Sequence, residues 1–242
     1  MSIALSYAIM THNELVEFGW LMDTLRPFLN EHCEIVVLDD FSTPEMVDRI
    51  KKEPVRFDQR ALNKNFSAQR NHLKNLCRGD FIFHLDTDEL PSRELLEELP
   101  VLLEGLRREN IDACAVPRLN LLVEGGQPVD ARALALSDAD LLNRERDDQI
   151  RIIRNRRHLV WTNHVHMRLV GIARACRFPQ ELRYALLHCK TQQRYETQSR
   201  FYRSFASRHV DKLRKSISKR LGHIKQPEWV DFATLRQDRK PC

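Results

Sequence analysis

Glycine is scarce in this sequence, with only 7 among 242 residues, and the first of them is Gly19. A glycine-rich phosphate-binding loop is therefore absent near the first expected strand, which argues against a nucleotidyltransferase built on such a loop. Long apolar runs are absent too, because no stretch approaches the roughly 20 residues that span a bilayer. Residues 1–10 contain neither a basic leader nor a small-residue cleavage site, so we expect a first strand there and not a signal peptide.

Cysteines are few and their positions suggest no pairing. The six are Cys33, Cys77, Cys114, Cys176, Cys189 and Cys242. Such spacing is typical of reduced thiols in a cytosol and not of a disulfide framework or a zinc site. We therefore expect a cytoplasmic protein. Internal repeats and low-complexity segments are also missing from the sequence.

The charge is unevenly distributed along the chain. Hydrophobic residues make up 42% and charged residues 30%, as in a soluble globular protein, and the net charge is +5. Residues 190–225 contain eleven Lys or Arg against two acids, and residues 151–174 contain six Arg and no acid. A basic carboxyl-terminal third indicates a polyanionic partner, which could be nucleic acid, an acidic membrane surface or a phosphorylated glycan.

Apolar runs and amphipathic stretches alternate over the first 86 residues. We expect strands at residues 3–10, 34–38, 55–57 and 81–85, and helices at residues 15–28, from Pro44 onward, and at 66–77. This alternation is typical of a mainly parallel, doubly wound sheet of the Rossmann type with helices on its faces. The sequence therefore predicts the α/β class.

The signals after residue 91 are less regular. We expect a helix at residues 92–108, strands at 113–116 and 184–188, a further apolar run at 119–123, and a hairpin formed by 150–153 and 160–161. If residues 163–171 are extended, His164, His166 and Arg168 lie on one face. Residues 131–143 are expected to form a mobile loop, and residues 192–221 a basic helix.

Three carboxylates follow the strand expected at residues 81–85, namely Asp86, Asp88 and Glu89. A strand that ends in this way brings acidic side chains to the carboxyl edge of the sheet, where ligands of open α/β folds bind. Two carboxylates two residues apart can hold a hard divalent cation that also takes phosphate oxygens. The alternative is a solvated turn that binds nothing.

Two earlier strands also end in polar residues. Residues 11–14 are Thr-His-Asn-Glu, and residues 39–43 are Asp-Asp-Phe-Ser-Thr. Parallel strands with right-handed crossovers bring these clusters to the same edge. Ordinary turn and capping chemistry is the alternative for each. Because the adjacent carboxylates of Asp39 and Asp40 repel each other, they need a donor-rich ligand or solvent nearby.

Together these motifs resemble the family 2 glycosyltransferases, which have the GT-A fold. The matching segments are residues 11–14, 39–43, 65–71, 86–89, 147–155 and 161–166. The last two resemble a subgroup that includes lipopolysaccharide-core glucosyltransferases and many glycosyltransferases of tailed phages. The resemblance covers roughly residues 3–205. It implies a GT-A domain at 1–190, with a nucleotide-sugar half at 1–117 and an acceptor half at 118–190, and a basic helical extension at 191–242.

The resemblance also implies a nucleoside-diphosphate sugar donor, by preference a UDP-sugar, and a bound Mg²⁺ or Mn²⁺. The residues that would bind the donor are Thr11, Asn13, Glu14, Asp39, Asp40, Asn65, Arg70, Asp86 and Thr87. Asp86, Asp88 and His188 would bind the metal. Arg70 would offer paired donors to the diphosphate. The alternatives are that Arg70 is a surface charge of a helix and that His188 is a structural hydrogen bonder.

Family 2 implies direct displacement with inversion at the anomeric carbon, which needs a base for the proton of the acceptor hydroxyl. Asp147 is our first choice, with Asp148, Glu124 and His166 as rivals, and the alternative is that Asp147 is a plain loop residue. The subgroup usually has His-Glu where this chain has His166 and Met167. If that Glu is the base in relatives, this chain uses another group.

The charge of the carboxyl-terminal segment is the main indication of the acceptor. The phage relatives and the basic segment favour DNA, with a sugar placed on a hydroxymethylated pyrimidine such as 5-hydroxymethylcytosine in the host cytoplasm. The residues expected to contact the polyanion are Arg200, Arg203, Arg208 and Lys212. One alternative is a cell-envelope glycan such as lipopolysaccharide, with the basic helix on an anionic membrane face. Another is a non-catalytic nucleic-acid-binding module on a nucleotide-binding fold.

Overall fold

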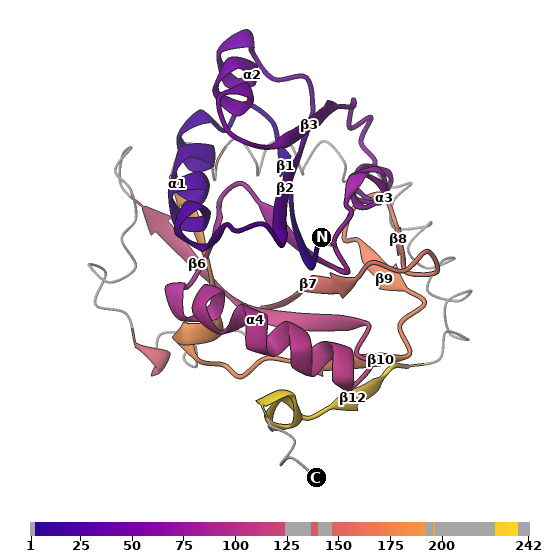
Figure 1. Ribbon diagram of the computed structural model, residues 1–242. Coiled ribbons are helices and arrows are strands. Elements are labelled where there is room, and N and C mark those ends of the chain that lie inside the picture. The colour runs from indigo at the N-terminus through magenta and orange to yellow at the C-terminus, as the bar shows by residue number, and fades with distance from the viewer. Residues whose placement is uncertain (1–2, 124–136, 140–146, 192–195, 197–225, 237–242) are drawn as a thin grey trace.

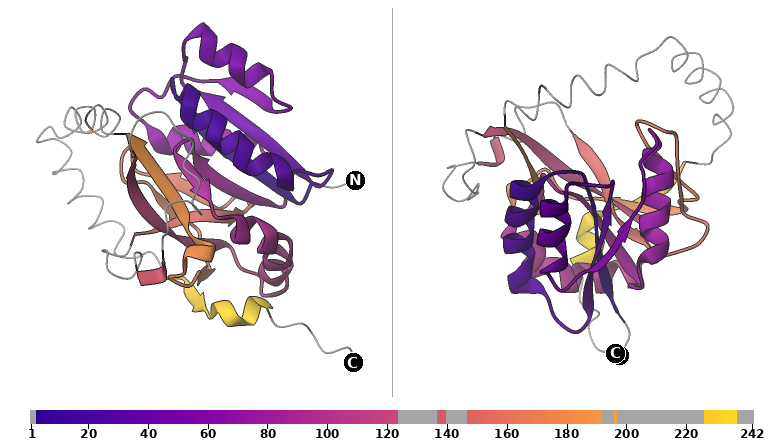
Figure 2. Two further views of the ribbon diagram at one scale, coloured as in Figure 1. Left: turned by 90° about the vertical axis from the view of Figure 1, so that its left-hand side faces the viewer. Right: turned by 90° about the horizontal axis from the view of Figure 1, so that it is seen from above.

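The computed structural model describes residues 3–123, 137–139, 147–191, 196 and 226–236. Within these residues, ten strands form one sheet in the order β12-β10-β6-β7-β4-β1-β2-β3, and β11 pairs with β5 and β6. Helices cover both faces of this sheet (Figures 1 and 2). The predicted α/β class is confirmed.

The first half of the chain forms four parallel strands joined by helices. The strands are β1 (Leu5–Thr11), β2 (Cys33–Asp39), β3 (Arg56–Gln59) and β4 (Phe81–Asp86). The helices are α1 (Leu15–Leu25), continued by the 3-10 turn η1 (Arg26–Phe28), then α2 (Pro44–Lys51) and α3 (Phe66–Leu76). The predicted alternation of strands and helices is confirmed. All four strands end at the same edge, so their terminal polar residues gather there.

Successive residues of β1 serve two separate cores. Tyr7 and Ile9 belong to the larger core, which also contains the apolar faces of α1 and α4. Ala8 belongs to the smaller core, together with Leu73 of α3 and Trp161. Because side chains alternate along a strand, a central strand needs cover on both faces, and this explains the unbroken apolar run.

The second half of the chain adds its strands on the β4 side of the first four, so that β3 remains an edge strand. The elements are β5 (Glu89–Pro91), α4 (Arg93–Arg108), β6 (Ala113–Val123), β7 (Asp148–Arg154), β10 (Arg174–Arg177), the 3-10 turn η2 (Leu182–Tyr184), β11 (Leu186–Thr191), β12 (Glu228–Val230) and the 3-10 turn η3 (Phe232–Arg236). Strand β7 runs antiparallel between β4 and β6, and β11 lies between β5 and β6. The predicted helix at 92–108 is confirmed as α4, capped by Ser92.

One sequence prediction in this half is wrong, and one condition named for the sequence is not met. The hairpin of residues 150–153 with 160–161 does not form, because β7 pairs with β4 and β6 while β8 (Val160–Thr162) pairs with β9 (Arg168–Val170). Ile152 and Ile153 are both fully buried, which fits a central strand with neighbours on both sides. Residues 163–167 form a turn and are not extended, since Asn163 and His166 have φ angles of 71° and 54°.

Strand β6 was predicted as two pieces and is one. It changes partners at Pro117, pairing with β7 up to that residue and with β11 from Arg118 onward. Strands β5, β10 and β12, of only three or four residues each, were not predicted.

The described carboxyl-terminal residues belong to the domain. Strand β12 pairs with β10, and η3 lies against α4, where Arg108 donates a hydrogen bond to the Thr234 carbonyl at 2.8 Å (Figure 1). Residues 226–236 therefore depart from the helical extension expected over 191–242, because their apolar side chains Phe232 and Leu235 are buried against the core. The predicted basic helix and mobile loop lie outside the described residues, apart from residues 137–139 and Glu196.

Five cysteines lie among the described residues, and all five are free thiols. No helix in this part of the chain is long and apolar enough to cross a membrane.

Candidate functional site

A cleft of about 790 Å³ opens at the carboxyl ends of β1, β2 and β4. Its facing wall comes from β7, β11 and the turn between β8 and β9. Small-molecule sites have volumes of roughly 300–1,000 Å³, so the cleft is large enough for a nucleotide and a sugar. The cleft is lined by many of the residues predicted for the site, namely Thr11, Glu14, Asp40, Arg70, Asp86, Thr87, Asp88, Asp148, His166 and His188.

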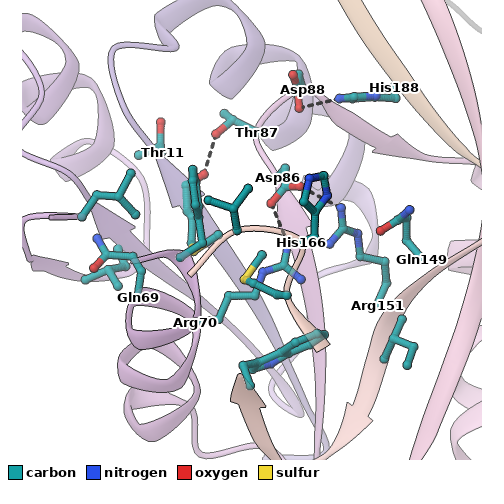
Figure 3. Close-up of a pocket in the computed structure, with 18 of the residues that line it drawn as sticks. Thr11, Gln69, Arg70, Asp86, Thr87, Asp88, Gln149, Arg151, His166 and His188 are labelled. Carbon is teal, nitrogen blue, oxygen red and sulfur yellow. Dashed lines mark hydrogen bonds and ion pairs between the residues drawn. The ribbon is translucent and has the colours of Figure 1, made fainter. Parts of the chain in front are cut away.

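Asp86 lies at the centre of the cleft between two arginines (Figure 3). Its two carboxylate oxygens accept hydrogen bonds from Arg70 at 3.0 Å and from Arg151 at 2.7 Å. Both arginine side chains are buried, whereas that of Asp86 is one-third exposed. Burial would raise the pKa of Asp86, but Arg151 and Arg70 outweigh it and hold the pKa well below its usual range. The carboxylate therefore stays ionised.

Arg151 reaches this position through a β-bulge. Cys114 of β6 pairs with Ile152, and the next residue, Ala115, pairs with Ile150, so Arg151 is an extra residue in β7. A bulge bends the strand and re-aims one side chain. Here it places Arg151, which stands between Ile150 and Ile152, against the carboxylates at the end of β4 and beyond it.

Glu89 extends the arrangement on the far side of Arg151. It is fully buried, pairs with Arg151, and accepts a hydrogen bond from Arg118 at 3.0 Å. Arg118 in turn donates to Asp147 at 2.8 Å. The result is a charge chain of alternating sign, made of Arg70, Asp86, Arg151, Glu89, Arg118 and Asp147.

Asp88 points to the other end of the cleft, toward His188 (Figure 3). Its Oδ1 lies 3.3 Å from the His188 Nε2, and both side chains are about 95% buried. The second oxygen, Oδ2, is buried and has no hydrogen-bond partner among the described residues. An unpaired buried carboxylate oxygen is unfavourable, so this atom needs a partner that the described residues do not supply.

Asp88 and His188 fit a divalent cation. Carboxylate oxygen and imidazole nitrogen are ordinary ligands for Mn²⁺, and Mg²⁺ takes one or two carboxylates together with substrate phosphates. The described residues contain no group of three or more His, Cys, Asp or Glu side chains placed to hold a metal by themselves. Of the predicted trio, Asp88 and His188 are adjacent, while Asp86 is engaged by the arginines.

The side of the cleft formed by the end of β1 and the turn after β4 is organised around Glu14. Its carboxylate accepts a hydrogen bond from Thr11 at 3.2 Å and also contacts the Thr87 hydroxyl, which joins the end of β1 to the turn after β4. Asp40 lines the same side, and its Oδ1 accepts from the Leu62 backbone at 2.8 Å.

Comparison with known proteins gives one decisive match. The model of glycosyl transferase family 2 matches residues 6–170, which is more than half of the chain. The chain belongs to glycosyl transferase family 2. No curated protein matches it.

Solved structures resemble this family 2 chain more distantly. The TarS protein of S. aureus in complex with UDP has 18% identity and a TM-score of 0.46, with 63% of this chain and 47% of that chain covered. TarS in complex with UDP-GlcNAc has 18% identity and a TM-score of 0.42, with 56% and 39% covered. Glucosyl-3-phosphoglycerate synthase from Mycobacterium tuberculosis, in complex with Mn²⁺, UDP and glucosyl-3-phosphoglycerate, has 18% identity and a TM-score of 0.39, with 51% and 45% covered. The chain thus spans under half the length of each.

Three predicted residues of the family 2 site lie outside the cleft and have internal partners. Asp39 is fully buried and accepts hydrogen bonds from Ser42 and Gln59. The Asn13 Oδ1 accepts a hydrogen bond from the Thr43 backbone N–H at 2.7 Å, and Asn65 caps α3 by accepting one from the Ala68 backbone N–H at 3.0 Å. Asp39 and Asn13 thus have the turn roles that were the alternative for their clusters, and Asn65 is a helix cap, a role the sequence analysis did not name.

Asp147 also lies outside the cleft lining and has three donors. Arg118, Asn120 and Gln149 all donate to its carboxylate. Burial raises the pKa of Asp147, but Arg118 and the other donors outweigh this and lower it. A carboxylate held ionised in this way is a weak base. Asp148 and His166 do line the cleft. Glu124 and the predicted polyanion contacts Arg200, Arg203, Arg208 and Lys212 lie outside the described residues.

Four residues near the site were missed from the sequence: Arg118, Asn120, Gln149 and Arg151. Arg118 and Asn120 alternate with Leu119 and Leu121, a period of two that indicates a strand with one polar face. This local pattern was sufficient to predict that Arg118 and Asn120 lie on the same face of a strand. The position of Arg151 depends on the bulge, for which the sequence gives no comparable sign.

Proposed function

We propose that this protein is a metal-dependent glycosyltransferase that moves a sugar from a UDP-sugar to a hydroxyl acceptor, with inversion at the anomeric carbon. The observation that supports this most directly is the Asp88 Oδ2, which has no partner within the described part of the chain and lies beside the His188 ring in a cleft that also holds Arg70 and Arg151. Asp88 and His188 would hold a Mg²⁺ or Mn²⁺ ion, which neutralises the charge that develops on the leaving diphosphate.

Other residues of the cleft would bind the donor and act as the base. Asp40 would accept hydrogen bonds from the nucleoside, because it lines the cleft beside Thr11. Arg70 would face the diphosphate. Burial and the neighbouring Arg151 lower the pKa of Arg70 to about 10, so it remains charged at neutral pH. The base would be Asp148 or His166, the two candidates that line the cleft.

The function is tested by donor hydrolysis and transfer with purified protein, Mn²⁺ and a set of UDP-sugars. We expect Asp88→Asn to lower turnover about 100-fold or more, because a metal supplies several kcal/mol of charge stabilisation. Asp80→Asn is the matched control, since Asp80 precedes the opposite end of β4 and its side chain is 57% exposed. Equal activity of the two variants would refute the role of Asp88.

For the acceptor, we propose a hydroxymethylated pyrimidine, 5-hydroxymethylcytosine, in phage DNA, with the reaction taking place in the host cytoplasm. The support is the excess of eleven Lys or Arg over two acids in residues 190–225, which include Arg200, Arg203, Arg208 and Lys212. Such a segment binds phosphates by displacing counterions. A cell-envelope glycan is the second candidate, with the same segment on an anionic membrane face.

The acceptor is tested by offering DNA with and without 5-hydroxymethylcytosine and weighing the digested nucleosides. We expect a gain of one hexose or pentose on the modified base alone. Hydrolysis of the donor with no sugar found on the DNA would favour a cell-envelope glycan as the acceptor. DNA binding without turnover of any donor would instead favour a non-catalytic nucleic-acid-binding module.

A further inference from the structure

The strand register places His188 beside Asn120. Strand β11 pairs with β6 in parallel, and His188 is opposite Asn120 in this pairing. The His188 Nδ1 lies 2.6 Å from the Asn120 Oδ1. Two residues before Asn120 on the same face of β6 is Arg118, and both side chains reach the carboxylate of Asp147.

The direction of each hydrogen bond in this group is fixed by Asp147. Two nitrogens of Arg118 lie 2.8 and 2.7 Å from its Oδ2, so the carboxylate is ionised and can only accept. The Asn120 side chain therefore turns its Nδ2 to Asp147, at 3.0 Å. Its Oδ1 must then face His188, and because an amide oxygen can only accept, the proton of the imidazole lies on Nδ1.

The other imidazole nitrogen, Nε2, is left to face Asp88. In a neutral imidazole with its proton on Nδ1, Nε2 carries a lone pair, which cannot form a hydrogen bond with a carboxylate. A lone pair and a carboxylate oxygen 3.3 Å apart suit a shared cation instead.

We propose that Asn120 and Asp147 are positioning residues of the metal site, which hold His188 in the one tautomer that presents Nε2 to a cation beside Asp88. This rests on the proposed function, in that a divalent metal binds at Asp88 and His188. It gives Asp147 a role different from the base predicted from the sequence. Partners of metal-binding histidines commonly fix the ring and its tautomer in this way.

The test is the affinity of the full-length protein for Mn²⁺ alone, measured by titration calorimetry in the absence of nucleotide. We expect Asn120→Leu to weaken Mn²⁺ binding by about 10–100-fold, the usual effect of removing such a partner. Gln149→Leu is the matched control. Gln149 also donates to Asp147, at 2.5 Å, but to Oδ1 and not along the path to His188. We expect it to change the affinity less than about twofold.

A second measurement needs no variant. The nitrogen chemical shifts of His188 in the wild-type protein report its tautomer directly, and we expect the proton on Nδ1. Equal Mn²⁺ affinity of Asn120→Leu and the wild type, or a proton on Nε2 of the neutral ring, would overturn the inference and leave the proposed function standing. If the wild-type protein bound no Mn²⁺ and transferred sugar in EDTA, the metal assignment itself would fail.

Discussion

At the scale of single residues, the site is a set of buried charges that depend on each other. Glu89 is fully buried and has Arg118 and Arg151 as partners, while Asp86 shares Arg151 with it. A buried ion pair adds little stability compared with apolar residues of the same shape, but removing one partner leaves an uncompensated charge. Arg118 and Arg151 each pair with two carboxylates, but the Arg151 side chain is 3% exposed and that of Arg118 is 18% exposed, so we expect the charge chain to depend most on Arg151.

We expect Arg151→Met to lower the free energy of unfolding by about 3–5 kcal/mol, because Glu89 and Asp86 each lose a buried partner. The measurement is urea denaturation at neutral pH. Arg93→Met is the control, since Arg93 forms an exposed pair with Glu97 one helical turn away, worth about 0.5 kcal/mol. A similar loss in both variants would mean that the buried charge chain adds nothing to stability.

At the scale of elements, the close packing of α4 against η3 ties the carboxyl-terminal residues to the sheet. A Cβ atom at Gly105 would lie 2.3 Å from the Leu235 carbonyl oxygen, so only glycine lets the two backbones approach. Phe232 packs against Phe178 and Tyr184 on the same side. Because Gly105 has no side chain, residues 232–236 can lie directly against α4.

We expect Gly105→Ala to destabilise the protein by about 1–3 kcal/mol, because the backbone of η3 has to move away from α4. Gly19→Ala is its counterpart within α1, where an added Cβ meets no atom within 4 Å. There the change should stabilise the protein by roughly 0.5–1 kcal/mol, since alanine is the better helix former. Thermal denaturation of both variants checks the pair, and stabilisation by Gly105→Ala would contradict the packing.

At the scale of the whole molecule, the sequence predicts the parallel half well and the rest poorly. Apolar runs that end in Thr11, Asp39 and Asp86 predict both the strands and the edge at which they meet, because each signal is local. The place of β7 between β4 and β6 depends on pairing between distant segments, and a three-residue strand such as β5 has no periodic signal. In the site, Asp86, Asp88 and Arg70 were predicted from local signals, whereas the position of Arg151 depends on a bulge in the pairing of β6 with β7 and was not predicted. Asn120 was missed although its alternation with Leu119 and Leu121 is a local signal.

The strand order has a consequence for how the chain acquires its structure. Strand β7 enters between β4 and β6, and β11 between β5 and β6, so both late segments insert between earlier ones. His188 is synthesised a hundred residues after Asp88, and it reaches Asp88 only once β11 has paired on both sides. Contacts between such distant segments form slowly, because a long loop must close first. During refolding, the parallel strands that carry the aspartates should therefore assemble early, and the ability to capture a metal should be among the last properties to return.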